Sequence, residues 1–499
     1  EIEQNVVRIL EKRNFTSKAR VLPGISYNYP NPTFFGQCIM TLISNTPNPA
    51  ILGFHICGRT GTNFGVAGIV SARQIREASD MLGVKYPLAS HSSGTAVLSV
   101  FGKEVRTDSP INKHHAVNFL EEIDGREPQL TILGAHGLGT ARFKSNVRKS
   151  PISDSVEKIL NWPRKHGPPD GKCINQHFQR DLQTMAIPKG DIAPRVLHRA
   201  KECYWSRIRS FLDATPEARD MVHVVPLDVA LAGADNIAFM EGLNLQTSTG
   251  FPLNCPKNRF LKRDRPPIPG ISSPISINDL PLEEELERIY DILASNERCY
   301  FVHRANLKDE PTKFGKNKIR VFSGCQLLMV VAYRQIYMSV MRLMHRYPQV
   351  FETGVGMNAA GPEWDASVRY ISQFCKDDNC SDLNGIAGDF SSFDKTLPCC
   401  ITMAAFDIQI RIMEYCGYSK RHLAIARGLA TECCHPLYEY NGVFLITDGS
   451  SPSGFPGTVD INGMGVSILL RCPYYEIYAD DPSRDFNKDV ALLTVGDDH

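Results

Sequence analysis

The chain has 499 residues, of which 42% are hydrophobic and 22% are charged, with 37 glycines and 32 prolines. This length predicts about three domain-sized units, and the composition is that of a folded protein rich in turns, which excludes a largely disordered chain. The formal net charge is +1, so binding to nucleic acid has to come from local basic patches rather than from the charge of the whole chain.

The cysteine pattern predicts reduced thiols in a cytosolic setting. The 15 cysteines lack paired spacing, and Cys399-Cys400 and Cys433-Cys434 are neighbours, too close for ordinary bridging. A zinc site is the weaker alternative, because no C-x-x-C pattern occurs. Arg334 interrupts the longest apolar run, so no stretch reaches the ~18 apolar residues of a membrane span.

The sequence divides into three regions. Residues 1–80 hold short β-favouring runs between Pro, Gly and Asn, which predicts antiparallel hairpins and an all-β unit. Residues 81–150 contain "PLASHSSGT", "DGREPQ" and "GAHGLGT", which predicts a junction that leads into the last region. In residues 151–499 helical and strand periods mix, which predicts an α+β domain.

A cysteine and a histidine stand close together in the first region, in "NPTFFGQC" and "GFHICGRTG". Cys38 and His55 suggest a nucleophile and a base, but in a chymotrypsin-type protease the base and the acid precede the nucleophile. None of the 37 residues before Cys38 is a histidine. An ordinary buried thiol and a core histidine are the structural alternative.

Two motifs in the last region carry paired aspartates. Asp389 and Asp394 lie in "GIAGDFSSFDKTLP", and Asp497 and Asp498 lie in "DVALLTVGDDH". Residues 490–495 are predicted to form a strand and the following Gly-Asp-Asp a tight turn. If the Asp389 and Asp497 segments are neighbours, they can hold Mg²⁺, and two ions about 4 Å apart can clamp both oxygens of a phosphoryl transfer. Turn or cap roles are the alternative.

The segment "GSSPSGFPGTVDINGMGVSILL" lies between these two motifs. Its Ser/Gly/Pro loop is predicted to run into a helix that Thr458 caps, and the helix would point Asp460 or Asn462 toward the same pocket. At the two ends, "EIEQNVV" lacks an initiator Met and "GDDH" resembles the tip of an open hairpin. We therefore expect the chain to be cut from a longer protein.

The order "DFSSFD", "SGFPGTVDIN" and "GDD" resembles motifs A, B and C of the RNA-dependent RNA polymerases of picorna-like viruses. Upstream, "LKDEPTKFGKNKIRVFS" resembles their motif F, "TSTGFP" the fingers segment before it, and "GVGMNAAGPEW" a segment between F and A. The six matches occur in order over residues 247–498. The resemblance implies the fingers and an incomplete palm of a right-hand polymerase, and we expect its thumb to be absent from this chain.

The resemblance also implies roles for individual residues. Asp389 and Asp497 would bind two Mg²⁺ or Mn²⁺ ions, with Asp498 a lesser ligand or a structural acid of the turn. Asp394, hydrogen-bonded with Ser453 and Asn462, would read the ribose 2′-OH. Lys308 and Arg320, aided by Lys318, would neutralise the triphosphate. The implied nucleotide-binding residues are Asp394, Ser453, Thr458, Asn462, Lys308, Lys318 and Arg320.

The basic residues have a structural alternative. Motif F is short, with Pro311 and Thr312 after its acid, and four basic residues between 313 and 320 also suit a solvated charged loop. A second basic run, "PKNRFLKRDR", follows "TSTGFP" and either holds template phosphates or is a solvated face.

A second pair of acids, in "YYEIYADDPS", resembles the YxDD of reverse transcriptases. In that alternative Asp480 would replace Asp497 and the product would be DNA. A helix of about three to four turns after Thr458 leaves little room for a strand before Tyr478. We therefore predict that Asp480 and Asp481 are exposed loop acids.

In the first region, P-T-x-x-G-Q-C followed by G-x-H-x-x-G resembles the C-terminal barrel of picornaviral 3C-type cysteine proteases over about residues 20–72. The resemblance implies that Cys38 is the nucleophile, with an oxyanion hole formed by the backbone N–H groups of residues 36–38. Thr33 and His55 would line a pocket for a substrate glutamine. Ile39 departs from the family, which usually has Gly there.

The sequence therefore predicts part of an all-β chymotrypsin-like barrel in residues 1–80, a junction in 81–150, and an α+β right-hand polymerase in 151–499. The expected reaction is template-directed transfer of ribonucleotides with Mg²⁺ or Mn²⁺, for viral genome replication in the host cytoplasm. The expected partners are RNA template and primer or product, ribonucleoside triphosphates, polyprotein substrate, and a membrane-associated replication complex reached through other viral proteins. A reverse transcriptase and a non-catalytic RNA-binding scaffold are the alternatives.

Overall fold

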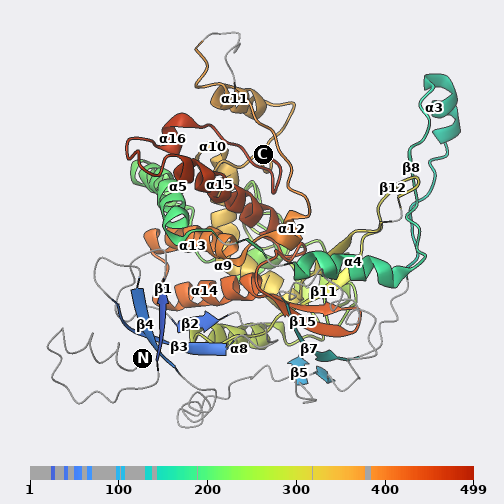
Figure 1. Ribbon diagram of the computed structural model, residues 1–499. Helices are drawn as coiled ribbons and strands as arrows, with labels where there is room; N and C mark the ends of the chain where they lie inside the picture. Colours follow the sequence, from blue (N-terminus) through green and yellow to red (C-terminus); the bar gives the residue numbers. More distant parts are fainter. Residues whose placement is uncertain are drawn as a thin grey trace. The chain divides into compact units, whose positions relative to one another are not determined.

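The computed structural model of this chain describes the strands between residues 24 and 69, residues 97–101, 103–106, 130–136, 143–187, 189–190, 192–316, 318–376 and 384–499. The chain divides into two compact units, Glu1–Ser92 and Ser93–His499. Each unit has its own main sheet, and Figure 1 labels β1 to β4 of the smaller unit and β7, β11 and β15 of the larger one.

The smaller unit contains a four-stranded antiparallel sheet in the order β1-β4-β3-β2. The strands are β1 (Gly24–Asn28), β2 (Ile39–Leu42), β3 (Ala50–Gly58) and β4 (Phe64–Ile69). This pairing agrees with the hairpins expected here, and the closed barrel stays a prediction. Cys38, Thr33 and the side chain of His55 lie outside the described part of the structure.

The larger unit is built on a five-stranded sheet in the order β13-β11-β14-β15-β7. β11 and β14 run parallel, and the other neighbours run antiparallel. Asn441 and Gly442 have φ values of 50° and 104°, which allow the tight turn between β14 and β15. The five strands are β7 (Leu130–Ala135), β11 (Val302–Leu307), β13 (Val321–Gly324), β14 (Leu437–Tyr440) and β15 (Val443–Thr447).

Three two-stranded ribbons and a set of helices complete the larger unit. The ribbons are β5 (Val97–Val100) with β6 (Lys103–Arg106), β8 (His166–Gly167) with β12 (Thr312–Lys313), and β9 (Leu261–Lys262) with β10 (Ser276–Ile277). The helices are α3 (Ser153–Leu160), α4 (Ile174–Ala186), α5 (Pro194–Ala214), α6 (Pro216–Asp220), α7 (Leu227–Ala232), η3 (Lys257–Arg259), α8 (Leu282–Ala294), α9 (Leu327–Arg346), α10 (Pro348–Phe351), α11 (Pro362–Ile371), α12 (Phe393–Thr396), α13 (Cys399–Tyr415), α14 (Lys420–Cys434), α15 (Thr458–Ile477) and α16 (Phe486–Asp489). This mixture confirms the α+β prediction.

The long helices share one hydrophobic core. α15 packs on α5 and α13, and α14 packs on α8 and α9. The rings of Tyr333 and Tyr337, both fully buried on α9, stack with their centroids 4.5 Å apart. Because α13 and α15 follow the two motifs that resemble A and B, the candidate site rests on well-packed helices.

In the described part of the chain, α9 is the one helix that is long and apolar enough to cross a membrane. However, 78% of its most apolar window is buried inside the structure. Arg334 lies in this helix, and its guanidinium donates to the carbonyl oxygen of Ala230. α9 is thus the central helix of the core.

Candidate active site

The two aspartates near the end of the chain lie on a tight turn. The N–H of Val495 donates to the carbonyl oxygen of Asp498 at 2.9 Å, and the N–H of Asp498 donates to that of Val495 at 3.3 Å. Gly496 has a φ of 66°, a left-handed conformation that most side chains disfavour. The turn predicted from Gly-Asp-Asp is confirmed.

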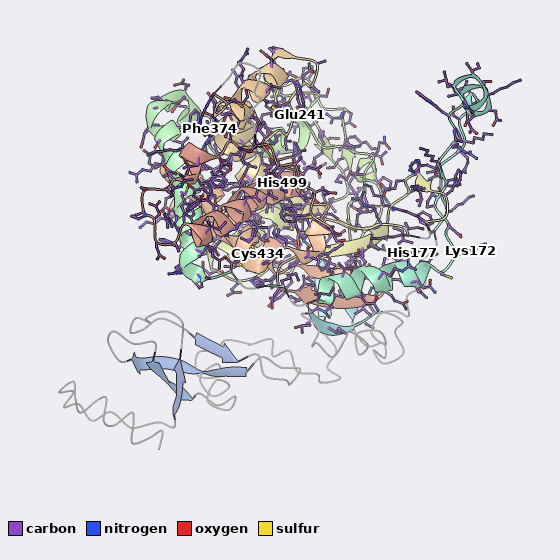
Figure 2. All side chains as sticks on the ribbon, turned by 45° about the horizontal axis from the view of Figure 1, so that its top comes forward. Lys172, His177, Glu241, Phe374, Cys434 and His499 are labelled. Carbon is purple, nitrogen blue, oxygen red and sulfur yellow. The ribbon has the colours of Figure 1, made fainter. Side chains whose placement is uncertain are left out.

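This turn pairs through its backbone with the segment that carries Asp389. Asp389 forms an antiparallel bridge with Asp498. The N–H of Gly388 donates to the carbonyl oxygen of His499 at 2.8 Å, and the N–H of His499 donates back at 3.0 Å. His499 is labelled in Figure 2. The two aspartate motifs, far apart in the sequence, are therefore neighbours, as the predicted metal site requires.

The strand predicted for residues 490–495 is wrong. α16 ends at Asp489, and the next four residues form neither helix nor strand. Thr494 instead donates from its N–H and its hydroxyl to the carbonyl oxygen of Glu352, at 2.8 and 2.9 Å. The β-branched run is thus fixed by a few contacts with a loop and not by a neighbouring strand.

The carboxylates of the candidate site repel one another. Burial raises the pKa of Asp497 above its usual value, and the nearby carboxylates of Asp389, Asp498 and Asp394 raise it further, although a hydrogen bond from its own backbone opposes this. Negative charge is therefore concentrated here, which is the electrostatic condition that favours a bound divalent ion.

The residues present fit a metal that also binds substrate. The described residues include no group of three or more His, Cys, Asp or Glu side chains placed to hold a metal ion by themselves. Mg²⁺ usually keeps several waters and takes one or two protein carboxylates together with substrate phosphates. Asp389 and Asp497 meet that need, so the donor set suits Mg²⁺ or Mn²⁺ rather than zinc.

A buried ion pair between Arg471 and Glu352 stabilises the segment that leads into the turn. Arg471 of α15 donates to the two carboxylate oxygens of Glu352 at 2.8 and 2.7 Å, and both side chains are fully buried. The backbone of Glu352 in turn holds Thr494. A Cβ on Gly463 would lie 2.7 Å from the hydroxyl of Thr494, so only glycine lets α15 approach this closely. Sequence reasoning missed this pair, although an arginine inside the apolar run "SILLRCPYY" was a signal.

Asp394 is placed on α12, beside the loop that leads toward α15. Its backbone carbonyl accepts from the N–H of Ser451 at 2.7 Å. Its carboxylate pairs with Lys395 at 3.2 Å, and Lys395 also reaches Asp181 of α4 at 3.3 Å. Burial alone would lower the pKa of Lys395, but the two aspartates raise it. Asp394 is thus held near the candidate active site by the backbone of Ser451 and by the ion pairs of Lys395.

The other two implied ribose readers are not joined to Asp394. The hydroxyl of Ser453 accepts from the N–H of Ser323 at 3.1 Å, and the amide oxygen of Asn462 is buried without a hydrogen-bond partner. No hydrogen bond links these three residues in the described part of the chain. A Cβ on Gly454 would lie 1.9 Å from the carbonyl oxygen of Ser323, so β13 packs directly on the loop. The ribose-reading role stays a prediction.

Thr458 does not cap its helix, contrary to the sequence prediction. Gly457 occupies the cap position and Thr458 is the first helical residue. The hydroxyl of Thr458 donates backwards to the carbonyl oxygens of Pro452 and Phe455, at 2.9 and 2.8 Å. The hydroxyl of Thr458 therefore closes the loop, and no side chain caps the start of this helix. Asp460 is buried and bonds to His345 at 2.7 Å.

The "YADD" segment lies at the end of a helix. α15 runs to Ile477, so Tyr478 is its C-terminal cap residue. Asp480 and Asp481 are exposed, and the carboxylate of Asp481 accepts from the hydroxyl of Ser483 at 2.6 Å. The prediction of exposed loop acids is confirmed.

The basic residues of motif F lie between β11 and β13, on β12 and the segments beside it. The N–H of Lys308 donates to the carbonyl oxygen of Arg320 at 2.9 Å. The side chains of Lys308 and Arg320 approach the same carboxylate, that of Glu310, at 3.0 and 3.6 Å. Both pairs are largely exposed, so they are weak and a phosphate can displace them. Lys318 is exposed on the same segment.

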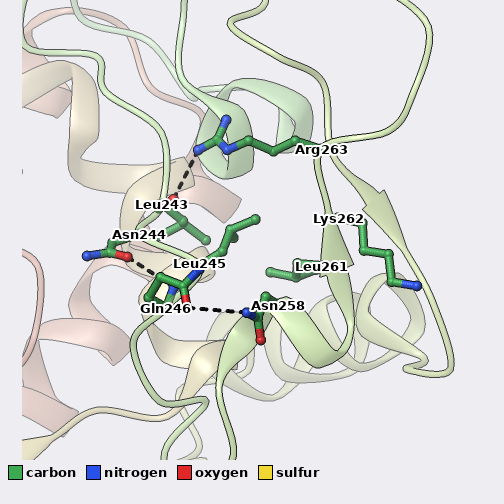
Figure 3. Close-up of a pocket in the computed structure, with 8 residues that line it drawn as sticks. All are labelled: Leu243, Asn244, Leu245, Gln246, Asn258, Leu261, Lys262 and Arg263. Atoms are coloured by element: carbon green, nitrogen blue, oxygen red, sulfur yellow. Dashed lines mark hydrogen bonds between the residues drawn. The ribbon is translucent and has the colours of Figure 1, made fainter.

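The second basic run borders a cavity of about 490 Å³ (Figure 3). Arg263 donates to the carbonyl oxygen of Leu243 at 3.1 Å, and Lys257 is buried and donates to Thr247 at 2.7 Å. These cations therefore fix local structure. Lys262 is exposed, which leaves it better suited than those two to contact RNA phosphates. The cavity is lined by Leu243, Asn244, Leu245, Gln246, Asn258, Leu261, Lys262 and Arg263.

The chain is similar to known viral polyproteins. The chain is 28% identical over 504 residues to a replicase polyprotein of Drosophila C virus (strain EB), covering 95% of this chain and 27% of that protein. It is 26% identical over 514 residues to an RNA1 polyprotein of Red clover mottle virus, covering 99% of this chain and 25% of that protein. The chain thus spans about a quarter of the length of these relatives.

A solved structure and a family model also match this chain. The solved structure of the Sicinivirus 3Dpol RNA dependent RNA polymerase superposes with a TM-score of 0.51 at 18% identity, over 71% of this chain and 67% of that one. This likeness is consistent with a right-hand polymerase fold. A family model described as viral RNA-dependent RNA polymerase matches residues 151–499. Since that range is more than half of the chain, the chain belongs to the family of viral RNA-dependent RNA polymerases.

Proposed function

We propose that the larger unit forms the fingers and palm of an RNA-directed RNA polymerase of a picorna-like positive-strand RNA virus. It would join ribonucleotides in the order set by an RNA template, with pyrophosphate as the leaving group. The observation that supports this proposal is the backbone bridge between Asp389 and Asp498, which joins two motifs that lie far apart in the sequence.

In this proposal Asp389 and Asp497 hold two Mg²⁺ or Mn²⁺ ions, with Asp498 as a further ligand or a structural acid. When bound, such ions neutralise phosphate charge and orient the attacking oxygen. Lys308 and Arg320 exchange their shared partner Glu310 for the triphosphate, because a phosphate offers more charge than one exposed carboxylate. Lys318 adds positive charge to the same segment.

The proposal is tested by extension of a primer on an RNA template, with the polymerase expressed from its complete coding sequence. We expect incorporation of ribonucleotides that requires Mg²⁺ or Mn²⁺ and stops on chelation with EDTA. Recovery after excess Mg²⁺ controls for unfolding. RNA binding without any incorporation under all these conditions would favour the scaffold alternative, and DNA synthesis would favour the reverse transcriptase.

Ribose selectivity is expected to depend on Asp394 and Asn462. Replacing either by alanine should weaken the preference for ribo- over deoxyribonucleotides by about 1–3 kcal/mol, because a polar partner of the 2′-OH is lost. The measurement is the ratio of kcat/KM for the two nucleotide types. Asp480→Asn, at an exposed site, is the control. Unchanged selectivity in both alanine variants would remove the ribose-reading role of these residues and of Ser453.

We further propose that the smaller unit is the C-terminal part of a 3C-type cysteine protease, with Cys38 as nucleophile and Thr33 and His55 in the glutamine pocket. The support is the antiparallel sheet β1-β4-β3-β2 and the match of nearly the whole chain to viral polyproteins. The unit would cleave the polyprotein that contains it. Replication is proposed to take place in the host cytoplasm, within a membrane-associated complex formed with other viral proteins.

A further inference from the structure

The side chains of Cys399, His435 and Asp448 form a chain of contacts from a thiol through an imidazole to a carboxylate. Cys399 is the first residue of α13, and its Sγ lies 3.8 Å from Nε2 of His435, just after α14. Nδ1 of the same histidine lies 2.8 Å from Oδ1 of Asp448, just after β15. Cys434, labelled in Figure 2, completes the group with its thiol buried beside Cys399.

This arrangement favours the charged forms of the thiol and the imidazole. The hydrogen bond from the Cys434 thiol and the adjacent His435 lower the pKa of Cys399 to about 5, although burial opposes this. Hydrogen bonds with Asp448 and Cys399 raise the pKa of His435 to about 9. A position at a helix N-terminus also favours a thiolate.

Further charged groups surround the cluster from other elements. The ammonium of Lys189, which follows α4, donates to the carbonyl oxygen of Asp448 at 3.2 Å. Arg298, which precedes β11, donates to the carbonyl oxygen of His435 at 2.7 Å and pairs with Glu432 of α14 at 3.0 Å. These two cations are balanced by the carboxylates of Glu432 and Asp448, so the surrounding charges add nothing to the preference for a thiolate. The Asp448 carboxylate by itself raises the pKa of Cys399. The remaining titratable neighbours on these helices are Cys400 and Cys433.

The cluster is connected to the loop before α15 by main-chain hydrogen bonds. The N–H of Gly449 donates to the carbonyl oxygen of Cys434 at 3.0 Å, and the N–H of Ser450 donates to that of Leu397 at 2.9 Å. A Cβ on Gly449 would lie 2.6 Å from the backbone nitrogen of Cys399, so the loop rests directly on the start of α13.

We propose that Cys399, paired with His435 and Asp448, is a nucleophilic thiolate and a site of covalent modification by soft electrophiles, including hydroperoxides. With an alkyl halide, an S–C bond forms and the halide leaves with the electron pair of the broken C–X bond. With a hydroperoxide, an S–O bond forms and the O–O bond breaks, so sulfur is oxidised to sulfenic acid while the leaving oxygen is reduced and takes a proton. This site is independent of the proposed polymerase function.

Alkylation with iodoacetamide at pH 6.0 and pH 7.5, followed by mass spectrometry of each cysteine peptide, tests the proposal on the native polymerase. An unperturbed thiol should react about 30-fold more slowly at the lower pH, because its thiolate fraction falls by that factor. The rate at Cys399 should stay within twofold. Cys173, which is exposed, serves as the control for access. A 30-fold fall at Cys399 would overturn the proposal.

Two variants then test whether His435 and Asp448 cause the reactivity of Cys399 at low pH. In His435→Gln the rate at Cys399 should become strongly dependent on pH, and in Asp448→Asn it should shift in the same direction by less. Circular dichroism confirms that both variants are folded. An unchanged, flat profile in His435→Gln would refute the pairing. Treatment with hydrogen peroxide and trapping with dimedone should label Cys399 before Cys173 in the native protein, and labelling in the opposite order would contradict the proposal.

Discussion

Replacing Asp497 by asparagine should reduce RNA synthesis by the proposed polymerase at least about a thousandfold. A metal ion contributes several kcal/mol of charge stabilisation to phosphoryl transfer, and loss of about 4 kcal/mol corresponds to this factor. The carboxylate is placed for the task, because its backbone turn is bridged to Asp389. The measurement is primer extension under single-turnover conditions with saturating Mg²⁺.

Asp480→Asn is the matched control, since it makes the same chemical change at an exposed position beyond α15. It should leave the rate within twofold of the unmodified enzyme. The reverse pattern, with Asp480 essential and Asp497 dispensable, would move the active site to "YADD". The reverse-transcriptase alternative would then be the better one.

Breaking the ion pair between Glu352 and Arg471 should destabilise the larger unit by about 3–5 kcal/mol, because the remaining charge is left buried without a partner. Both side chains are fully buried and joined by two hydrogen bonds of 2.7 and 2.8 Å. The variants are Glu352→Gln and Arg471→Met. Urea unfolding can be followed by fluorescence of Trp205, because α5, which carries it, packs on α15.

The double variant Glu352→Gln with Arg471→Met separates pairing from packing. If each single change is costly mainly because it strands the other partner, the double variant should be more stable than the sum of the single effects predicts. Strict additivity would show that the two residues act independently. RNA synthesis should fall in the single variants at temperatures where they remain folded, since the backbone of Glu352 holds Thr494.

The features that were predicted correctly from the sequence depend on local chemistry or on the order of the motifs. The turn at Gly496 follows from residues that tolerate a left-handed conformation. The proximity of Asp389 to the turn came from the motif order of a family, and the exposure of Asp480 came from the space that a helix needs. Each of these can be inferred without knowledge of long-range packing.

The predictions that failed, and the features that were missed, depend on contacts between distant segments. Thr494 is fixed by a loop around Glu352, so its β-branched neighbours form no strand. The partner of Arg471 is 119 positions away, and periodicity within one helix cannot identify it. Cys399 and His435 meet only because α13 and α14 pack together. In each case tertiary packing overrides the local preference.

The link between Asp389 and Asp498 is made entirely by main-chain atoms. Exchange of the carboxylate of Asp389 or Asp497 for an amide is therefore expected to leave this backbone link intact, so a loss of RNA synthesis in such a variant can be assigned to the missing carboxylate. Such proteins are suited to trapping a primed template with an unreacted nucleotide for imaging. The main-chain link between the two aspartate motifs would thus allow RNA synthesis to be stopped by a side-chain exchange while the complex with template and nucleotide stays assembled.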